Sequence, residues 1–147
     1  MSALLRLPGA GFSGESAASS RFLLMNAALW RQRMSEEIAR RMDADALGVK
    51  GVYLFGSTNS GEAGTGSDID LIIHVDDDAE KRVLLHAWLD GWNEALCALN
   101  EILTGCRQER ILDVHLVTDA DIARHECFAT KIHSVYEPVL QLRLTMN

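Results

Sequence analysis

Two acidic side chains stand at the start of an apolar segment, residues 67–75, that is typical of a β-strand. Because side chains alternate between the two faces of a strand, Asp68 and Asp70 are predicted to project from one face and the apolar residues from the other. Two neighbouring carboxylates repel each other, and neither can be buried as an anion without a partner. A divalent cation between them resolves both problems. Mg²⁺ is the expected ion, because it takes one or two carboxylate ligands and leaves its other positions to water and phosphates.

A Gly-Ser turn precedes this acidic segment. Residues 51–55 are typical of a buried strand, and Gly56 and Ser57 follow directly. Gly56 allows the backbone to approach a ligand closely, while the Ser57 hydroxyl and the amides after it can donate hydrogen bonds to phosphate oxygens. Donors for an anion are therefore predicted beside ligands for a cation, which is the pattern of a phosphate-and-metal site.

The spacing of these residues resembles the signature of the nucleotidyltransferases of the DNA polymerase β superfamily, particularly their minimal single-domain members. That signature is Gly-Ser, three residues, Gly, five residues and Ser-Asp-x-Asp-Leu, and it is filled without a gap by Gly56, Ser57, Gly61, Ser67, Asp68, Asp70 and Leu71. The resemblance covers roughly residues 51–118. One position departs from it: many members have a basic residue directly after Gly-Ser, where this chain has Thr58.

The resemblance implies transfer of a nucleoside monophosphate from an NTP, with ATP as the expected donor, to an acceptor hydroxyl with release of pyrophosphate. Asp68 and Asp70 would hold two Mg²⁺ ions, and Gly56 and Ser57 would bind the nucleotide phosphates. The resemblance also implies the nucleotidyltransferase fold. The order helix, strand, strand, helix, strand separately predicts an α+β fold, in which helices cover one side of a short mixed sheet.

A third carboxylate completes the site in polymerase β-like enzymes, and two residues compete for its place on the predicted strand 110–118. Asp113 is preferred as metal ligand and as a group that helps to take the acceptor proton, because an acid binds Mg²⁺ far better than an imidazole does. The alternative rests on a frequent family sequence, Val-Asp-Leu-Val-Thr, which would align His115 with the carboxylate. In that case the chain could be an inactive relative that still binds nucleotides.

Composition narrows the class of protein. The 147 residues, 48% of them hydrophobic, suit a single domain at 19–147 behind a loose N-terminal arm at 1–18. The net charge of −7 disfavours a nucleic-acid partner, since binding to phosphate backbones needs clustered Lys and Arg. The acceptor is therefore expected to be a small molecule or a protein. Three cysteines without a C-x-x-C pair, and no recognisable signal peptide or membrane span, predict a cytoplasmic protein.

Two helices are predicted beside the strands. The first runs from residue 19 or 20 to Gly48, and its solvated face includes Arg31. The second spans residues 79–104 and ends at Gly105, with an apolar stripe wide enough to be buried across a sheet. Four apolar residues widen that stripe: Leu84, Trp88, Ala95 and Ile102.

Partner proteins are implied by the resemblance alone. Minimal family members lack an acceptor domain, which implies a homodimer or a partner that completes the cleft. Some of them pair with a small helical protein, in certain cases as the antitoxin of a two-protein system. Residues 128–147 are expected to form a loop with a strand or packing tail.

Overall fold

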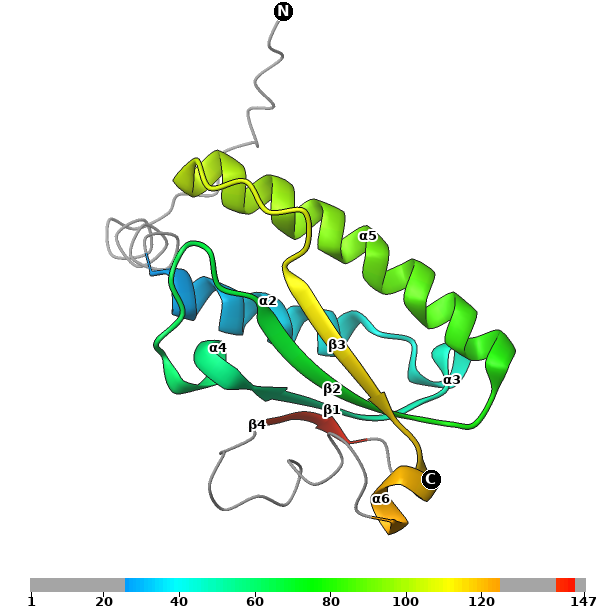
Figure 1. Cartoon of the computed structure of the whole chain (residues 1–147). Helices are drawn as coiled ribbons and strands as arrows, with labels where there is room; N and C mark the ends of the chain where they lie inside the picture. The colour runs from blue at the N-terminus through cyan, green and yellow to red at the C-terminus, as the bar shows by residue number, and fades with distance from the viewer. Residues whose placement is uncertain (1–25, 125–139, 145–147) are drawn as a thin grey trace, which may run out of the picture.

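Four strands form one sheet at the centre of the structure, a computed structural model that describes residues 26–124 and 140–144 (Figure 1). In chain order they are β1 (Val49–Phe55), β2 (Ile69–Val75), β3 (Leu112–Val117) and β4 (Leu140–Leu144). Their order in space is β3-β2-β1-β4. Strand β1 is antiparallel to β2 and β4, whereas β2 and β3 are parallel. The predicted mixed sheet of an α+β fold is confirmed.

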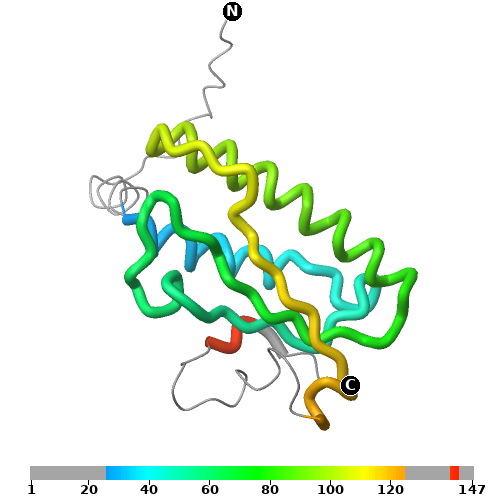
Figure 2. Tube along the Cα trace, viewed as in Figure 1, coloured from blue at the N-terminus to red at the C-terminus, as the bar shows by residue number. Residues whose placement is uncertain are grey.

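The helices of the described residues flank these strands, and the two longest of them cover one face of the sheet. They are α2 (Ala27–Arg41), α3 (Ala44–Leu47), α4 (Gly56–Ser60), α5 (Ala79–Thr104) and α6 (Asp119–Ala123). Figure 2 shows α2 and α5 lying along the same side of the strands. Helices α2, α3 and α5 share one hydrophobic core with the strand residues that face them, among them Leu54, Leu71 and Ile73. The opposite face has a smaller apolar cluster around Phe55, Ile72 and Val117.

The first predicted helix is wrong as one continuous element. Helix α2 begins after Asn26, whose backbone is extended and whose side chain accepts a hydrogen bond from the Leu29 amide at 2.9 Å. It ends at Arg41, and α3 starts after a second cap, Asp43. Asn and Asp side chains satisfy the free amides of a first helical turn, which favours a new helix start over continuation. Gly48 ends α3 in the left-handed conformation, as predicted.

The prediction that Arg31 lies on a solvated helix face is also wrong. Arg31 is fully buried, with its guanidinium carbon 4.6 Å from the centre of the Trp30 ring. The other charged residues of this helix lie at its surface as predicted, and several form ion pairs within one turn, such as Arg33 with Glu36. Arg31 therefore belongs to the interior.

Helix α5 has the predicted ends but a narrower buried side. Asp78 caps its start, and Gly105 ends it with a φ of 72°. Leu85, Leu89 and Leu96 are buried against the sheet. Three of the four residues that widen the stripe are exposed instead, and Trp88 is half-buried. A helix lying on a sheet buries one side only, so the wide stripe leaves apolar residues facing away from the core.

Part of the predicted organisation falls on residues outside those described. The arm at 1–18 is one such segment, as is most of the segment 128–147, of which β4 alone is described. Strand β4 agrees with the expected strand in that segment. None of the helices in the described part of the chain combines the length and apolar character that crossing a membrane requires.

Candidate active site

Asp70 and Asp113 are direct partners in the parallel pairing of β2 and β3. Paired residues of neighbouring strands point to the same face of a sheet, about 4.8 Å apart. The Asp113 carboxyl is accordingly close enough to Asp70 to raise the pKa of Asp70. Asp68 precedes β2, where it is exposed and close enough to interact electrostatically with Asp113. The sheet thus places Asp70 and Asp113 side by side on the face opposite α2 and α5, and Asp68 lies just before β2.

Burial and neighbouring negative charges raise the pKa values of Asp70 and Asp68. The pKa of Asp70 is raised to about 6, first by burial and then by the negative charges of Asp113 and Asp68. The pKa of Asp68 is raised by desolvation of its carboxyl and by Asp113, while Arg31 acts in the opposite direction. A bound cation would favour the ionised forms of Asp70 and Asp68, whose pKa values are raised in its absence.

The Gly-Ser turn lies against the Asp70 carboxyl. Phe55, the last residue of β1, pairs with Asp70, so Gly56 begins α4 directly beside it. Gly56 has a φ of 72°, and a Cβ atom there would overlap Asp70 Oδ2 and lie 3.2 Å from Cγ. Both the backbone conformation and the space therefore require glycine. The structure brings this turn and the acids together, as the sequence predicts.

Thr58 explains the departure from the family signature. It stands where many members have a basic residue, but its side chain is fully buried and its hydroxyl donates to the Asp68 carbonyl at 3.2 Å. Thr58 therefore attaches the Gly-Ser turn to the acidic segment and adds no charge. Half-buried Ser57 precedes it, and its carbonyl accepts from the Glu62 amide at 2.9 Å.

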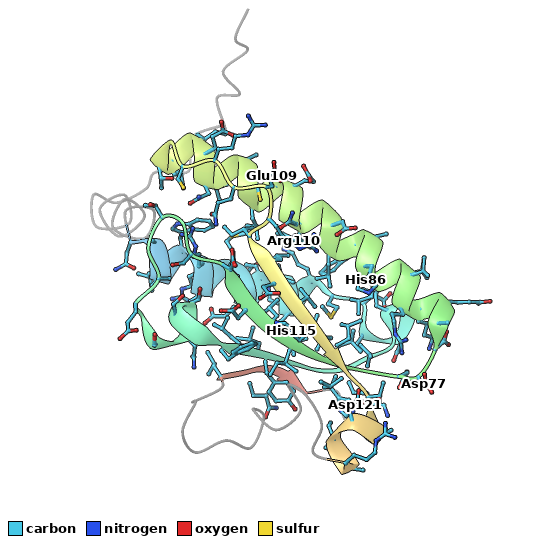
Figure 3. All side chains as sticks on the ribbon, in the orientation of Figure 1. Asp77, His86, Glu109, Arg110, His115 and Asp121 are labelled. Carbon is cyan, nitrogen blue, oxygen red and sulfur yellow. The ribbon has the colours of Figure 1, made fainter. Side chains whose placement is uncertain are left out.

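His115, which is labelled in Figure 3, lies on β3. It follows Asp113 by two residues and so projects from the same face of the sheet. It is the register partner of Ile72, so Asp113 and not His115 stands beside Asp70. The His115 Nε2 atom lies 3.4 Å from Asp113 Oδ1, and its ring contacts Phe55 with 6.0 Å between ring centres. His115 can therefore reach the third carboxylate but does not replace it.

Comparison with known proteins decides the family. A family model described as the nucleotidyltransferase domain matches residues 35–134, which is more than half of the chain. The chain belongs to the nucleotidyltransferase domain family. The family predicted from the Gly-Ser and Asp-x-Asp motifs is confirmed. This assignment supports nucleotidyl transfer, with an NTP as donor, as the general class of reaction.

Two further comparisons give no additional information about the function of this chain. A crystal structure of a Sulfolobus solfataricus protein provisionally named a nucleotidyltransferase is 18% identical and covers 79% of this chain and 85% of that chain. Its TM-score of 0.28 is too low to carry weight. A search of curated proteins finds no match.

The donor atoms of this nucleotidyltransferase suit a hard divalent cation. Asp70 and Asp113 offer adjacent carboxylate oxygens, the ligands that Mg²⁺ prefers. Within residues 26–124 and 140–144, no three His, Cys, Asp or Glu side chains form a preassembled metal cluster. Asp68, exposed and outside the strand, would complete the donor set by rotation of its side chain. The chemistry of the acids fits a bound metal, with Asp68 as the adjustable member.

Proposed function

We propose that this nucleotidyltransferase transfers a nucleoside monophosphate from ATP to a hydroxyl group of a small molecule or a protein, with Mg²⁺ as cofactor. The observation that best supports the proposal is the contact between two motifs: the Gly-Ser turn begins beside Asp70, and Asp70 pairs with Asp113. Anion donors and cation ligands on one surface are what a metal-bound triphosphate requires.

Each residue has a distinct proposed role. Asp68, Asp70 and Asp113 would hold Mg²⁺, which when bound supplies charge for the triphosphate and acidifies the attacking hydroxyl. Gly56 keeps the space beside Asp70 free of a side chain, so that a phosphate could reach the amides of the turn. The Ser57 hydroxyl would donate to the β- or γ-phosphate and stabilise the charge that develops on pyrophosphate.

The residues of β3 are the proposed acceptors of the proton in this reaction. Asp113 would help to take the proton of the acceptor hydroxyl, because it lies on the edge strand β3 directly beside Asp70. His115, 3.4 Å away, would orient the Asp113 carboxylate or contact the acceptor. The acidic net charge of −7 supports an acceptor other than a nucleic acid.

We further propose a cytoplasmic location. Cys97 and Cys106 are free thiols, which suits a reducing compartment. The absence of a disulfide between these two residues agrees with the proposal without deciding it.

A thermal-shift screen tests nucleotide binding directly. Wild-type protein is heated with each of the four NTPs, with and without Mg²⁺, and compared with Asp70→Asn. Asp45→Asn is the matched control, since Asp45 is an exposed acid on α3. We expect Mg-ATP to stabilise the wild type and the control but not Asp70→Asn. Equal stabilisation of all three proteins, or undiminished Mg²⁺-dependent pyrophosphate release by Asp70→Asn, would refute the proposed site.

A second candidate function, binding of a helical protein partner, is favoured by the apolar stripe that α5 leaves exposed. Leu84 is 55% exposed and Ile102 is 81% exposed. Six small or apolar residues follow one another at alternating spacings of four and three, the pattern of a helix–helix seam: Leu84, Trp88, Gly91, Ala95, Ala98 and Ile102. Such a partner could be a second copy of the chain or the protein that accepts the nucleotide.

Two measurements separate these possibilities. Light scattering on wild type and Ile102→Glu gives the oligomeric state, and a dimer that the variant loses indicates self-association through α5. A monomer that co-purifies with a helical partner, which then gains nucleotide mass in the presence of ATP, indicates an antitoxin-like role. Stabilisation by Mg-NTP without release of pyrophosphate from the NTP, whichever acceptor is added, would instead indicate an inactive nucleotide-binding relative.

A further inference from the structure

The segment that leads into Asp68 is held by its backbone carbonyls. Figure 1 shows this segment, the end of the loop between α4 and β2, beside the start of α2. Arg31 on α2 donates from Nε to the Ser67 carbonyl and from Nη2 to the Thr65 carbonyl, both at 3.1 Å. One guanidinium therefore binds two carbonyls of a segment that lies more than thirty residues away in the chain.

The remaining carbonyls of the segment have donors from other elements. Asn100 on α5 donates to the Thr65 carbonyl at 2.9 Å, and Gln108 donates to the Gly66 carbonyl at 2.9 Å. The Asp68 carbonyl accepts from Thr58, as described above. Four consecutive carbonyls, those of residues 65–68, are thus fixed by side chains from α2, α4, α5 and the segment after α5.

Arg31 is the central member of this arrangement. Its Nη2 atom also donates to Asn100 Oδ1 at 3.1 Å, which aligns the Asn100 amide toward Thr65 and toward Gln108 Oε1. Arg31 forms no salt bridge with a carboxylate in the described residues, although it interacts electrostatically with Asp68. Carbonyl oxygens satisfy its donors, but they do not neutralise its charge.

A buried cation without a paired anion is not expected to stabilise the fold by itself. Apolar side chains of similar size often serve a protein core equally well or better. An apolar residue could not donate hydrogen bonds to the carbonyls on either side of Gly66. It also could not place a positive charge near Asp68. Arg31 also contacts the Trp30 ring and donates to the Ala27 carbonyl, but its two bonds to the acidic segment are the ones that cross from α2 to the site.

We propose that Arg31 is a positioning residue, which fixes the direction in which Asp68 enters the metal site by holding the carbonyls of Thr65 and Ser67. This inference rests on the proposed function, because Asp68 needs positioning only if it takes part in binding the metal–nucleotide complex. Asp68 is the one acid of the three that lies outside a strand, so the sheet alone does not fix it. Arg31, with Asn100 and Gln108, supplies that missing constraint.

The first test uses metal-free protein and requires no activity. Hydrogen exchange is measured for the amides of residues 64–70 in wild type, Arg31→Met and the control Arg33→Met, whose wild-type residue is exposed on the same helix. We expect faster exchange across this segment in Arg31→Met alone, with the exchange of β1 unchanged. Unchanged exchange at residues 64–70 would overturn the proposal. If Arg31→Met does not fold, Gln108→Leu provides the same comparison, because it removes the donor to the Gly66 carbonyl and the acceptor of the Asn100 amide while leaving Arg31 in place.

The second test separates positioning from a general structural role. The Mg²⁺ concentration that half-saturates the ATP-induced thermal shift is measured for Arg31→Met, Asp68→Asn and the double variant. We expect Arg31→Met to raise this Mg²⁺ concentration about tenfold, because the variant loses a directed, charge-assisted hydrogen bond. If Arg31 acts through Asp68, the same substitution should have no further effect in the Asp68→Asn background. An equal rise in both backgrounds would overturn the inference.

Failure of the proposed function gives a different result. Wild-type protein would then show no Mg²⁺-dependent response to any NTP, and the role of Arg31 at a metal site would fall with it, even where exchange shows that the carbonyls are held. A normal wild-type response together with an unchanged Mg²⁺ requirement in Arg31→Met would leave the proposed function standing and overturn the inference alone.

Discussion

Asp70 and Asp113 are register partners across the parallel pair β2 and β3, so both side chains lie on the same face of the sheet. Burial, reinforced by Asp113 and Asp68, raises the pKa of Asp70 to about 6. Ionisation of Asp70 is therefore unfavourable on this face of the sheet, and a bound cation would make it more favourable. Its effect on the free energy of unfolding can be measured in the metal-free protein.

The stability of the metal-free protein should decline as Asp70 ionises. An ordinary Asp has a pKa of about 3.9, so the folded state binds more protons than the unfolded state between about pH 4 and 6. The stability contribution of the protonated group is complete below about pH 4 and is lost as the pH rises through 6. At pH 8 in EDTA we expect Asp70→Asn to be more stable than wild type by about 1 kcal/mol, after discounting for solvent screening.

Urea unfolding at pH 4.5 and pH 8 measures this effect. The advantage of Asp70→Asn should shrink toward zero at the lower pH, while Asp45→Asn on α3 should show no such pH-dependent gain. An Asp70→Asn protein that is less stable than wild type at pH 8 would contradict the electrostatic account of the pair.

Substitution of Gly56 should damage the site more than substitution of another left-handed glycine. Gly56→Ala combines an unfavourable φ of 72° with an overlap against the Asp70 carboxyl, whereas Gly61 has a φ of 83° and open space where a Cβ atom would lie. We expect Gly61→Ala to lose about 1 kcal/mol through backbone strain, and Gly56→Ala to lose about 2–4 kcal/mol and its response to Mg-ATP. Chemical unfolding and the thermal shift give the two quantities. Similar losses for both variants would mean that the contact with Asp70 is unimportant.

The third ligand position can be decided by comparing Asp113 with His115. Because Asp113 and not His115 pairs with Asp70, we expect Asp113→Asn to reduce Mg²⁺-dependent pyrophosphate release by at least about a hundredfold. His115→Gln should reduce it by about tenfold or less, as expected for a group that supports a ligand from outside. The opposite ranking would assign the ligand position to His115. Circular dichroism of both variants confirms that each one is folded.

The sequence is most informative where structure depends on neighbouring residues. The need for close backbone approach predicts the glycine at position 56, whereas strand alternation does not extend to Asp68, which precedes β2. The acids of residues 76–78 are typical of a helix start, and Asp78 does cap α5. Gly105 ends the same helix. Caps and turns are local, which is why these boundaries can be predicted without knowledge of the fold.

The sequence does not show which residues far apart in the chain contact each other. The environment of Arg31 depends on carbonyls from a loop that joins two later elements, and a charged residue on a helix is usually solvated. A signal is nevertheless present: Arg31 lies four residues before Ser35 and seven before Ile38, on the side of α2 that is buried. On α5 the opposite happens, and apolar residues that the sequence predicts to be buried are exposed. Apolar periodicity identifies the apolar side of a helix but does not show which surface covers it.

The position of Asp113 depends on a buried amide that the sequence does not identify. Asn93 on α5 accepts two hydrogen bonds at Oδ1, from the Ile111 amide at 2.9 Å and the Leu112 amide at 3.0 Å. These residues lead into β3 immediately before Asp113. Asn93 therefore joins the helix layer to the strand that carries the third acid.

Replacing Asn93 by Leu should leave both backbone amides without an acceptor. Because each buried unsatisfied donor is destabilising by about 1–3 kcal/mol, we expect Asn93→Leu to lose about 2–5 kcal/mol of unfolding free energy in urea. Asn93→Asp keeps an acceptor oxygen in the same place and serves as the matched control, which should retain more of the stability at pH 5 than Asn93→Leu does. If Asn93→Leu is as stable as wild type, water or a shifted backbone must satisfy those amides, and the start of β3 is not fixed by α5. If it is destabilised but still binds Mg-ATP when folded, Asn93 supports the fold of β3 without setting the geometry of Asp113.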